Sequence, residues 1–151
     1  MGMDVFGKHP SSETGKYFRN NIWWWHPLWT FCESVAEDLI PSDNAGHWNE
    51  GWGLCEAKAI ALAGRLEELL ESGTVKSYEE VRNKALAAMP EESCRICDGT
   101  GTRQSAAGSS PCNTCEGTGK VKPWVTHYPF SEDNVREFAA FLRDCGGFEI
   151  C

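Results

Sequence analysis

The sequence lacks several features that would place it quickly in a class of protein. No run approaches the roughly 20 apolar residues that a membrane-spanning helix needs, and the N-terminal stretch has no apolar segment typical of a secretory signal. Basic residues are scarce, with 14 Lys and Arg against 22 Asp and Glu, for a formal net charge of −8. We therefore expect a cytoplasmic protein with no membrane segment, and we disfavour nucleic acid as a partner because phosphate binding needs surplus positive charge.

Catalytic signatures are missing as well. The chain has no Walker loop, no nucleophile elbow, no His-Glu-x-x-His sequence and no paired carboxylates. Its four histidines show no metal-ligand spacing, and we assign no role to them: His9, His26, His47 and His127. The sequence therefore predicts a protein that is not an enzyme.

What is present indicates a folded protein. A chain of 151 residues with 41% hydrophobic side chains can bury a core and carry a small additional module. We predict a mainly α fold of about four helices with a small zinc-stapled β-hairpin module, α+β overall. One compact domain would contain a helical part (residues 1–90), a zinc-knuckle module (91–122) and a C-terminal strand and helix (123–151) that pack back on the helical part.

Two helices are predicted in the first half of the chain. Pro27 suits a first helical turn, and an apolar stripe with helical spacing follows it to about residue 39: Leu28, Cys32, Val35 and Leu39. The second helix runs over residues 54–71 and ends at Gly73. The preceding residues 1–26, rich in Gly, Pro, Ser and Asn, predict an irregular arm.

Two more helices and a strand are predicted in the second half. Ser77 and Glu80 match a capping box for a helix whose inward stripe would be Tyr78, Val81, Ala85 and Ala88. Residues 120–125 favour a short strand. Ser131 is placed to cap a last helix through residue 144, whose apolar stripe is Val135, Phe138, Leu142 and Cys145.

A repeated cysteine motif is the most specific feature of the sequence. The pattern Cys-x-x-Cys-x-Gly-x-Gly occurs twice, and its ligand candidates are Cys94, Cys97, Cys112 and Cys115. Each Cys-x-x-Cys turn, which we call a knuckle, presents two sulfurs on one side, and two facing knuckles give tetrahedral four-sulfur coordination. The glycines allow positive φ, so that backbone N–H groups can turn toward the thiolates. We predict one structural zinc ion, because four sulfurs leave no open coordination position.

Residues 94–119 resemble half of the cysteine-rich zinc region of DnaJ (Hsp40-type) chaperones. That family carries four such repeats and two zinc ions, so the resemblance implies one zinc ion here. It also implies a zinc-stapled hairpin that serves protein contacts. The chain has no His-Pro-Asp signature of a J-domain, so the resemblance does not extend to co-chaperone activity.

Other interpretations of the cysteines stay open. A redox dithiol, a disulfide pair, or iron in place of zinc would use the same residues. Cys32, Cys55 and Cys145 could form a second site with His26 or His47, but each lies on the apolar stripe of a predicted helix and is expected to pack as a small hydrophobe.

Tryptophan is the other outlier, with seven residues. The rings could form a core layer between the first two helices, or a surface that stacks a planar ligand or a partner. Side chains alternate along an extended segment, so one of the three consecutive tryptophans, Trp24, is expected to be exposed or covered by another chain. Candidate ligand- or partner-binding residues are Arg19, Asn21, Trp23, Trp24, Trp25, Trp48, Asn49 and Trp52.

Two functions follow as hypotheses. The first is a noncatalytic zinc-binding interaction protein that binds a protein partner or itself. The second is a small-molecule binding protein that holds a nucleotide-like ring in a Trp-rich pocket. The segments MDVFGKHP and YFRNNIWWWHPLW are similar to short uncharacterised proteins of phages and mobile elements. That resemblance implies action on a host protein or on a small defence signal.

Overall fold

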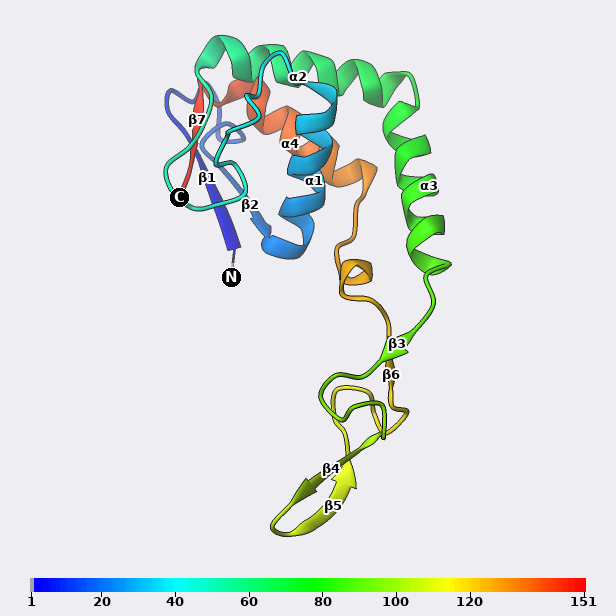
Figure 1. Ribbon diagram of the computed structural model, residues 1–151. Helices are drawn as coiled ribbons and strands as arrows, with labels where there is room; N and C mark the ends of the chain where they lie inside the picture. The colour runs from blue at the N-terminus through cyan, green and yellow to red at the C-terminus, as the bar shows by residue number, and fades with distance from the viewer. Residues whose placement is uncertain (1) are drawn as a thin grey trace. The chain divides into compact units, whose positions relative to one another are not determined.

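Residues 2–151, which the computed structural model describes, form four α-helices and three small antiparallel sheets. The predicted α+β class is therefore confirmed (Figure 1). The described chain divides into two compact units, the first made of residues 2–83 and 128–151 and the second of residues 84–127. No helix of this described part is long and apolar enough to cross a membrane.

The first unit contains a three-stranded antiparallel sheet with strand order β2-β1-β7. Its strands are β1 (Gly2–Gly7), β2 (Tyr17–Asn21) and β7 (Phe148–Ile150). Val5 in β1 pairs with Phe18 on one side and with Ile150 on the other. The N-terminal and C-terminal strands therefore lie side by side (Figure 1).

The N-terminal hairpin shows that the predicted irregular arm over residues 1–26 is wrong. Alternate residues of its strands face the core, and the exposed fractions of Met3, Val5 and Phe18 are 3%, 0% and 8%. This alternation is typical of a strand with one buried face. It is hard to see in the sequence because each strand is short and the turn between them is rich in Gly, Pro and Ser.

Helix α1 (Ile22–Val35) begins before Pro27, the predicted first turn, and ends before the predicted residue 39. The Asn21 side chain caps the helix by accepting a hydrogen bond from Trp24 N at 3.1 Å. The three consecutive tryptophans are therefore helical, and successive rings point about 100° apart. The argument that an extended segment must expose Trp24 does not apply, although Trp24 is half-buried and not part of the core.

Helices α2 (Glu56–Glu71) and α4 (Glu132–Asp144) confirm two of the helix predictions and pack against each other. The Ser131 side chain caps α4 as expected, by accepting a hydrogen bond from Asn134 N at 3.2 Å. Gly73, at φ +78°, follows the end of α2. The apolar stripes of both helices are buried: Ala59, Leu62, Leu66, Val135, Phe138 and Leu142.

Helix α3 (Thr74–Ala87) departs from its prediction in start and orientation. It begins directly after Gly73, so Ser77 lies inside the helix and caps nothing. Tyr78 packs on Phe31 and Phe130, but Val81 is 70% exposed, and Ala85 and Ala88 are exposed as well. The predicted inward stripe is wrong beyond the first turns, because only that part of the helix meets the aromatic core.

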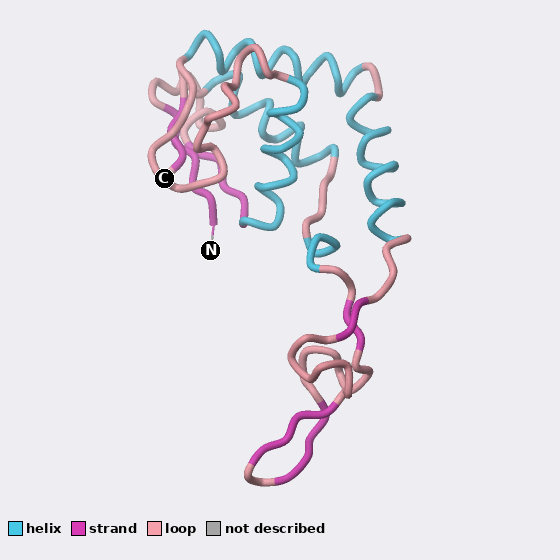
Figure 2. The backbone as a smooth tube through the Cα atoms, viewed as in Figure 1, coloured by secondary structure: helices cyan, strands magenta, loops and turns pink. Residues whose placement is uncertain are grey.

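The second unit contains two short strand pairs (Figure 2). They are β3 (Glu92–Ser93) with β6 (Lys120–Val121), and β4 (Thr102–Ser105) with β5 (Gly108–Pro111). The strand predicted over residues 120–125 is shorter than expected. Pro123 cannot donate to a strand ladder, and a 3-10 turn, Trp124–His127, follows it.

Stacked aromatic rings dominate the core of the first unit. Trp25 and Trp29 are fully buried and nearly parallel, with ring centroids 5.4 Å apart and an interplanar angle of 9°. Phe138 of α4 meets both rings edge-on. Of the two interpretations of the tryptophan cluster, a core layer is therefore confirmed for Trp25 and Trp29.

Replacing Trp29 with Ala is expected to lower the free energy of unfolding of the first unit by about 3–5 kcal/mol. The change removes a buried ring and the hydrogen bond that its Nε1 donates to Asn44 Oδ1 at 2.9 Å. Trp48, 62% exposed, is the matched control, and its replacement with Ala should change stability by no more than about 0.5 kcal/mol. Denaturant titration followed by circular dichroism measures both, and equal losses would contradict the placement of Trp29 in the core.

Candidate metal centre

The sulfur atoms of all four motif cysteines converge in the second unit. Their Sγ atoms lie within 4.8 Å of one another. The Sγ–Sγ distance is 4.0 Å between Cys94 and Cys112 and 3.7 Å between Cys97 and Cys115. A Zn–S bond of about 2.3 Å places the sulfurs of a tetrahedral site about 3.8 Å apart. The cluster therefore has the size and ligand set of a four-sulfur metal site.

Backbone N–H groups point at these sulfurs, as the glycine positions predict. Gly101 N donates to Cys97 Sγ at 3.2 Å, and Gly119 N donates to Cys115 Sγ at 3.3 Å. Both glycines have φ near +75°, a region that other residues rarely adopt. Such donors stabilise the negative charge of a thiolate, which is the form of cysteine that binds metal.

The two knuckles are related by an approximate internal two-fold symmetry. Cys94 N donates to Gly119 O, and Cys112 N donates to Gly101 O, both at 2.8 Å. The strand that enters each knuckle therefore pairs with the strand that leaves the other knuckle, as Figure 2 shows. Each half of the repeat completes its partner, so neither half is expected to hold its shape alone.

The cysteine cluster supplies almost the whole interior of the second unit. Its buried cluster consists of the four cysteines, with Val121 packed partly against them. The strands β4 and β5 are exposed along their whole length. A segment this polar cannot offset its loss of chain entropy by apolar burial, and an ion bound by the cysteines would supply the missing stabilisation.

The thiols differ in how readily they lose their protons. Burial raises the pKa of Cys94 to about 11. Burial also raises the pKa of Cys112, but hydrogen bonds from the backbone N–H groups of Cys115 and Thr114 oppose it, and the pKa is lowered to about 7. Burial likewise raises the pKa of Cys97, but the Gly101 N–H together with hydrogen bonds from the Cys94 and Cys115 thiols outweighs it, and the net shift is downward. Part of the cluster can therefore ionise near neutral pH, and a bound cation would displace the remaining protons.

The remaining cysteines do not form a second site. Cys32 and Cys145 are fully buried, as predicted, and burial raises the pKa of each thiol. The prediction for Cys55 is wrong, because this residue precedes the first turn of α2 and is exposed. Among residues 2–151, the four motif cysteines are the one group of three or more His, Cys, Asp or Glu side chains placed to hold a metal.

Three of the predicted ligand-binding residues lie together. Arg19, Asn21 and Trp24 line a cavity of about 360 Å³ between the N-terminal ends of α1 and α4. Asp133 and Glu137 also line this cavity, and their negative charges would repel an anionic ligand.

The other predicted ligand-binding residues are separated from that cavity. Trp25 is in the core, where its Nε1 donates to Gly46 O at 2.8 Å, so it offers no surface. Trp23 packs on Tyr128, and Trp52 packs edge-on against Trp29. Trp48 is exposed, and Asn49 Nδ2 donates to Gly2 O at 3.0 Å. The tryptophans therefore do not form one continuous pocket.

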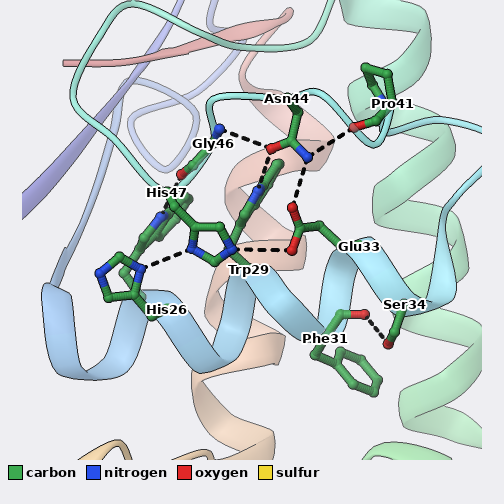
Figure 3. Close-up of polar contacts among 10 residues, drawn as sticks. His26, Trp29, Phe31, Glu33, Ser34, Pro41, Asn44, Gly46 and His47 are labelled. Carbon is green, nitrogen blue, oxygen red and sulfur yellow. Dashed lines mark hydrogen bonds and ion pairs between the residues drawn. The ribbon is translucent and has the colours of Figure 1, made fainter.

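A polar group that the sequence does not indicate lies beside the aromatic core (Figure 3). His26 Nδ1 is 2.9 Å from His47 Nδ1, and His47 Nε2 is 3.1 Å from Glu33 Oε2. Asn44 Nδ2 donates to the other carboxylate oxygen of Glu33 at 2.7 Å. The two histidines are 21 residues apart, so no local spacing could have identified them as partners.

No family model, curated protein or solved structure matches this chain. Its function is therefore argued from the chemistry and geometry of its own residues.

Proposed function

We propose that Cys94, Cys97, Cys112 and Cys115 bind one structural zinc ion. The separations of the sulfurs suit zinc, and four thiolates leave no position for water or substrate. Iron accepts the same ligands, so native mass spectrometry of the protein purified without chelator is the test. One zinc ion per chain is expected, and a metal-free or iron-loaded protein would contradict the assignment.

We further propose that the zinc module is a noncatalytic binding module for an extended segment of a partner protein. The observation that carries this proposal is an open groove of about 800 Å³ beside the cysteine cluster, with Val121 in its wall. Two of its apolar side chains are strongly exposed, Ile96 at 54% and Trp124 at 66%. Large apolar side chains gathered in a concave surface are typical of a binding site.

The edge of β3 beside the groove favours an extended occupant. Cys94 N donates to Gly119 O across the ladder, and backbone groups alternate in direction along a strand. The N–H and C=O of Ser93 therefore point away from β6. On the opposite edge, the Thr118 hydroxyl already bonds to both backbone groups of Lys120. The β3 edge is thus the side where a further strand can add.

The internal symmetry makes this edge distinctive. The position equivalent to Ser93 in the second repeat is Pro111, which has no N–H and cannot accept a strand in the same way. The position equivalent to Ile96 is Thr114. One half of the module therefore combines an apolar side chain with an open edge, and the other half has neither.

The charges of the groove suit a peptide better than a nucleic acid. Its wall carries three basic and three acidic residues: Arg95, Lys120, Lys122, Glu91, Glu92 and Glu116. A neutral wall of mixed sign gives no net attraction for phosphates. It matches an extended segment with apolar side chains and little net charge.

The two resemblances support the same choice of partner. The likeness to the DnaJ zinc region favours protein contacts, and the likeness to short phage and mobile-element proteins makes a cytoplasmic host protein the first class of partner to test.

Selection of displayed peptides on the zinc-loaded full-length protein tests this function. Extended apolar peptides are expected to bind, and Ile96→Asp should weaken them at least about tenfold, the effect of losing one well-packed apolar contact. Ser93→Pro should weaken binding as well, because proline removes the N–H with which an added strand would pair. The variant is expected to fold, since the equivalent position in the second repeat is already a proline, Pro111. Val81→Asp, on the exposed face of α3, is the control and should leave binding unchanged.

The outcome is clear if the variants keep their zinc. Failure to select any peptide, or equal affinity for the native protein and for Ile96→Asp, would contradict the binding groove. Loss of zinc in a variant would instead indicate damage to the module, and that variant would be replaced by Trp124→Ser.

The alternative function, binding of a nucleotide-like ring, has one supporting observation. Arg19, Asn21 and Trp24 line a common cavity, but Asp133 and Glu137 beside them would repel a phosphate. Titration of tryptophan fluorescence with nucleotides tests it, and Trp24→Phe identifies the reporting ring.

A further inference from the structure

Three side chains of the first unit form a hydrogen-bonded line. Glu33 and His26 lie on α1, and His47 lies between them on the loop formed by residues 36–55 (Figure 3). His26 faces His47 through Nδ1, and His47 faces Glu33 through Nε2. All three side chains are only partly exposed. Each contact in this line requires a proton on one side and a lone pair on the other.

The carboxylate determines which atoms hold the protons. Ionised Glu33 only accepts hydrogen bonds, so His47 Nε2 carries a proton and donates it. In neutral His47 the Nδ1 atom is then a lone pair, and His26 Nδ1 must donate to it. His26 Nε2 is left as the basic atom of the line.

One added proton leaves every contact intact. It binds His26 Nε2, and the proton on His26 Nδ1 passes to His47 Nδ1. His47 becomes the imidazolium beside the Glu33 carboxylate, and His26 is again neutral. A second added proton cannot be placed in the same way, because both Nδ1 atoms would then carry hydrogens at a separation of 2.9 Å. Two positive rings would also repel each other.

The loop that carries His47 covers the aromatic core. Asn44 Oδ1 accepts hydrogen bonds from Trp29 Nε1 and from Gly46 N, both at 2.9 Å. Gly46 is packed so closely that an added Cβ would lie 2.2 Å from the Trp29 ring. Trp48 follows His47 on the same loop and is exposed. A change at His47 is therefore transmitted directly to the cover of the buried ring pair.

We propose that His26, His47 and Glu33 form a proton-operated latch: the line stays closed with no proton or one proton added, and a second proton releases the loop around His47 and Trp48 from α1. The titratable groups that face His26 are His47 from the loop and Tyr128 from the segment before α4, with Glu33 one contact further along.

The electrostatics of the closed line agree with this assignment. Burial lowers the pKa of His26 below its ordinary value, and the charge of His47 lowers it further. Because the unfolded chain then binds more protons than the folded protein below pH about 6.5, stability falls as the pH decreases through that range. The closed latch is therefore the neutral-pH state, and opening occurs on acidification.

Fluorine NMR of protein labelled with 5-fluorotryptophan tests the latch, with the Trp48 signal identified by Trp48→Phe. In the native protein the Trp48 and Trp29 signals are expected to shift together on going from pH 7 to pH 5, at a midpoint below the ordinary histidine value. His26→Asn should abolish this shared transition. In that variant His47 can take up an added proton beside Glu33, and no second positive ring faces it. His9→Asn, on an exposed residue, is the control and should leave the transition unchanged.

Two results would overturn the proposal. The first is a His26→Asn variant whose signals shift at the native midpoint. The second, which needs no variant and so does not depend on its folding, comes from ring ¹⁵N spectra of the native protein. Recorded well above the ordinary pKa of histidine, where no proton has been added, these must show neutral His26 with its proton on Nδ1 and neutral His47 with its proton on Nε2. The opposite tautomer of either ring at that pH contradicts the line.

Discussion

Replacing Cys112 with Ser is expected to unfold the second unit and to leave the first unit folded. The apparent free energy of zinc binding in small zinc modules is about 10–16 kcal/mol, and this unit has no other buried cluster than its four cysteines and Val121. The first unit has its own aromatic core, to which none of the four motif cysteines contributes. Loss of the metal should therefore collapse the amide NMR dispersion of residues 91–122 alone.

Cys55→Ser is the matched control for this experiment. Cys55 is exposed and lies outside the cluster, so its replacement should keep one metal ion per chain and the full set of dispersed signals. Removal of the ion from the native protein with a chelator should reproduce the Cys112→Ser spectrum. A module that keeps its dispersed signals without metal would contradict the structural role of the ion.

Gly101→Ala should abolish metal binding, whereas Gly99→Ala should only weaken the module. Both glycines have φ near +75°, so both changes carry the cost of about 1–2 kcal/mol of a left-handed residue with a side chain. They differ in the space available. A Cβ at Gly101 would lie 2.2 Å from Gly117 O, but at Gly99 its nearest neighbour is Ser93 Oγ at 3.5 Å.

The collision at Gly101 is with backbone of the other knuckle, which cannot move without separating the sulfurs. Gly101 N also donates to Cys97 Sγ, and that hydrogen bond would be lost with the displacement. Competition with a chromophoric chelator measures zinc affinity in both variants. Similar zinc affinities for Gly101→Ala and Gly99→Ala would contradict this prediction. They would show that the need for glycine at position 101 comes from its positive φ alone and not from the close approach of the two knuckles.

The proposed division of roles between the two units follows from what each one buries. The first unit has an extensive apolar core, which accounts for its fold without a bound ion. The second buries little beyond its four motif cysteines and exposes Ile96 and Trp124 around a groove. A metal-stabilised module can present apolar side chains in this way because its fold does not depend on burying them.

Local patterns in the sequence were enough for several predictions. The convergence of the four cysteines follows from their spacing, since a knuckle involves residues three positions apart. The glycine positions follow from the positive φ that the knuckle requires. Helices α2 and α4 follow from apolar periodicity over several turns, and the Ser131 cap follows from a single local hydrogen bond.

Most of the predictions that failed depended on distant residues, although the local capping box at Ser77 failed too, because the helix begins at Thr74. The arm over residues 1–26 looked irregular because β1 becomes a central strand only when β7, from the other end of the chain, pairs with it. The stripe of α3 was placed inward because its pattern cannot show that the aromatic core ends near Tyr78. Trp25 looked available to a ligand because its partner Gly46 is 21 residues away.

The sequence by itself therefore determined the four-cysteine cluster, since its cysteines, its turns and its glycines are all encoded within two short repeats. Only the tertiary structure decided which tryptophans are buried, which strand edge stays open, and that His26 meets His47. Each of these depends on long-range packing, in which residues far apart in the chain become neighbours, and no local spacing records such contacts.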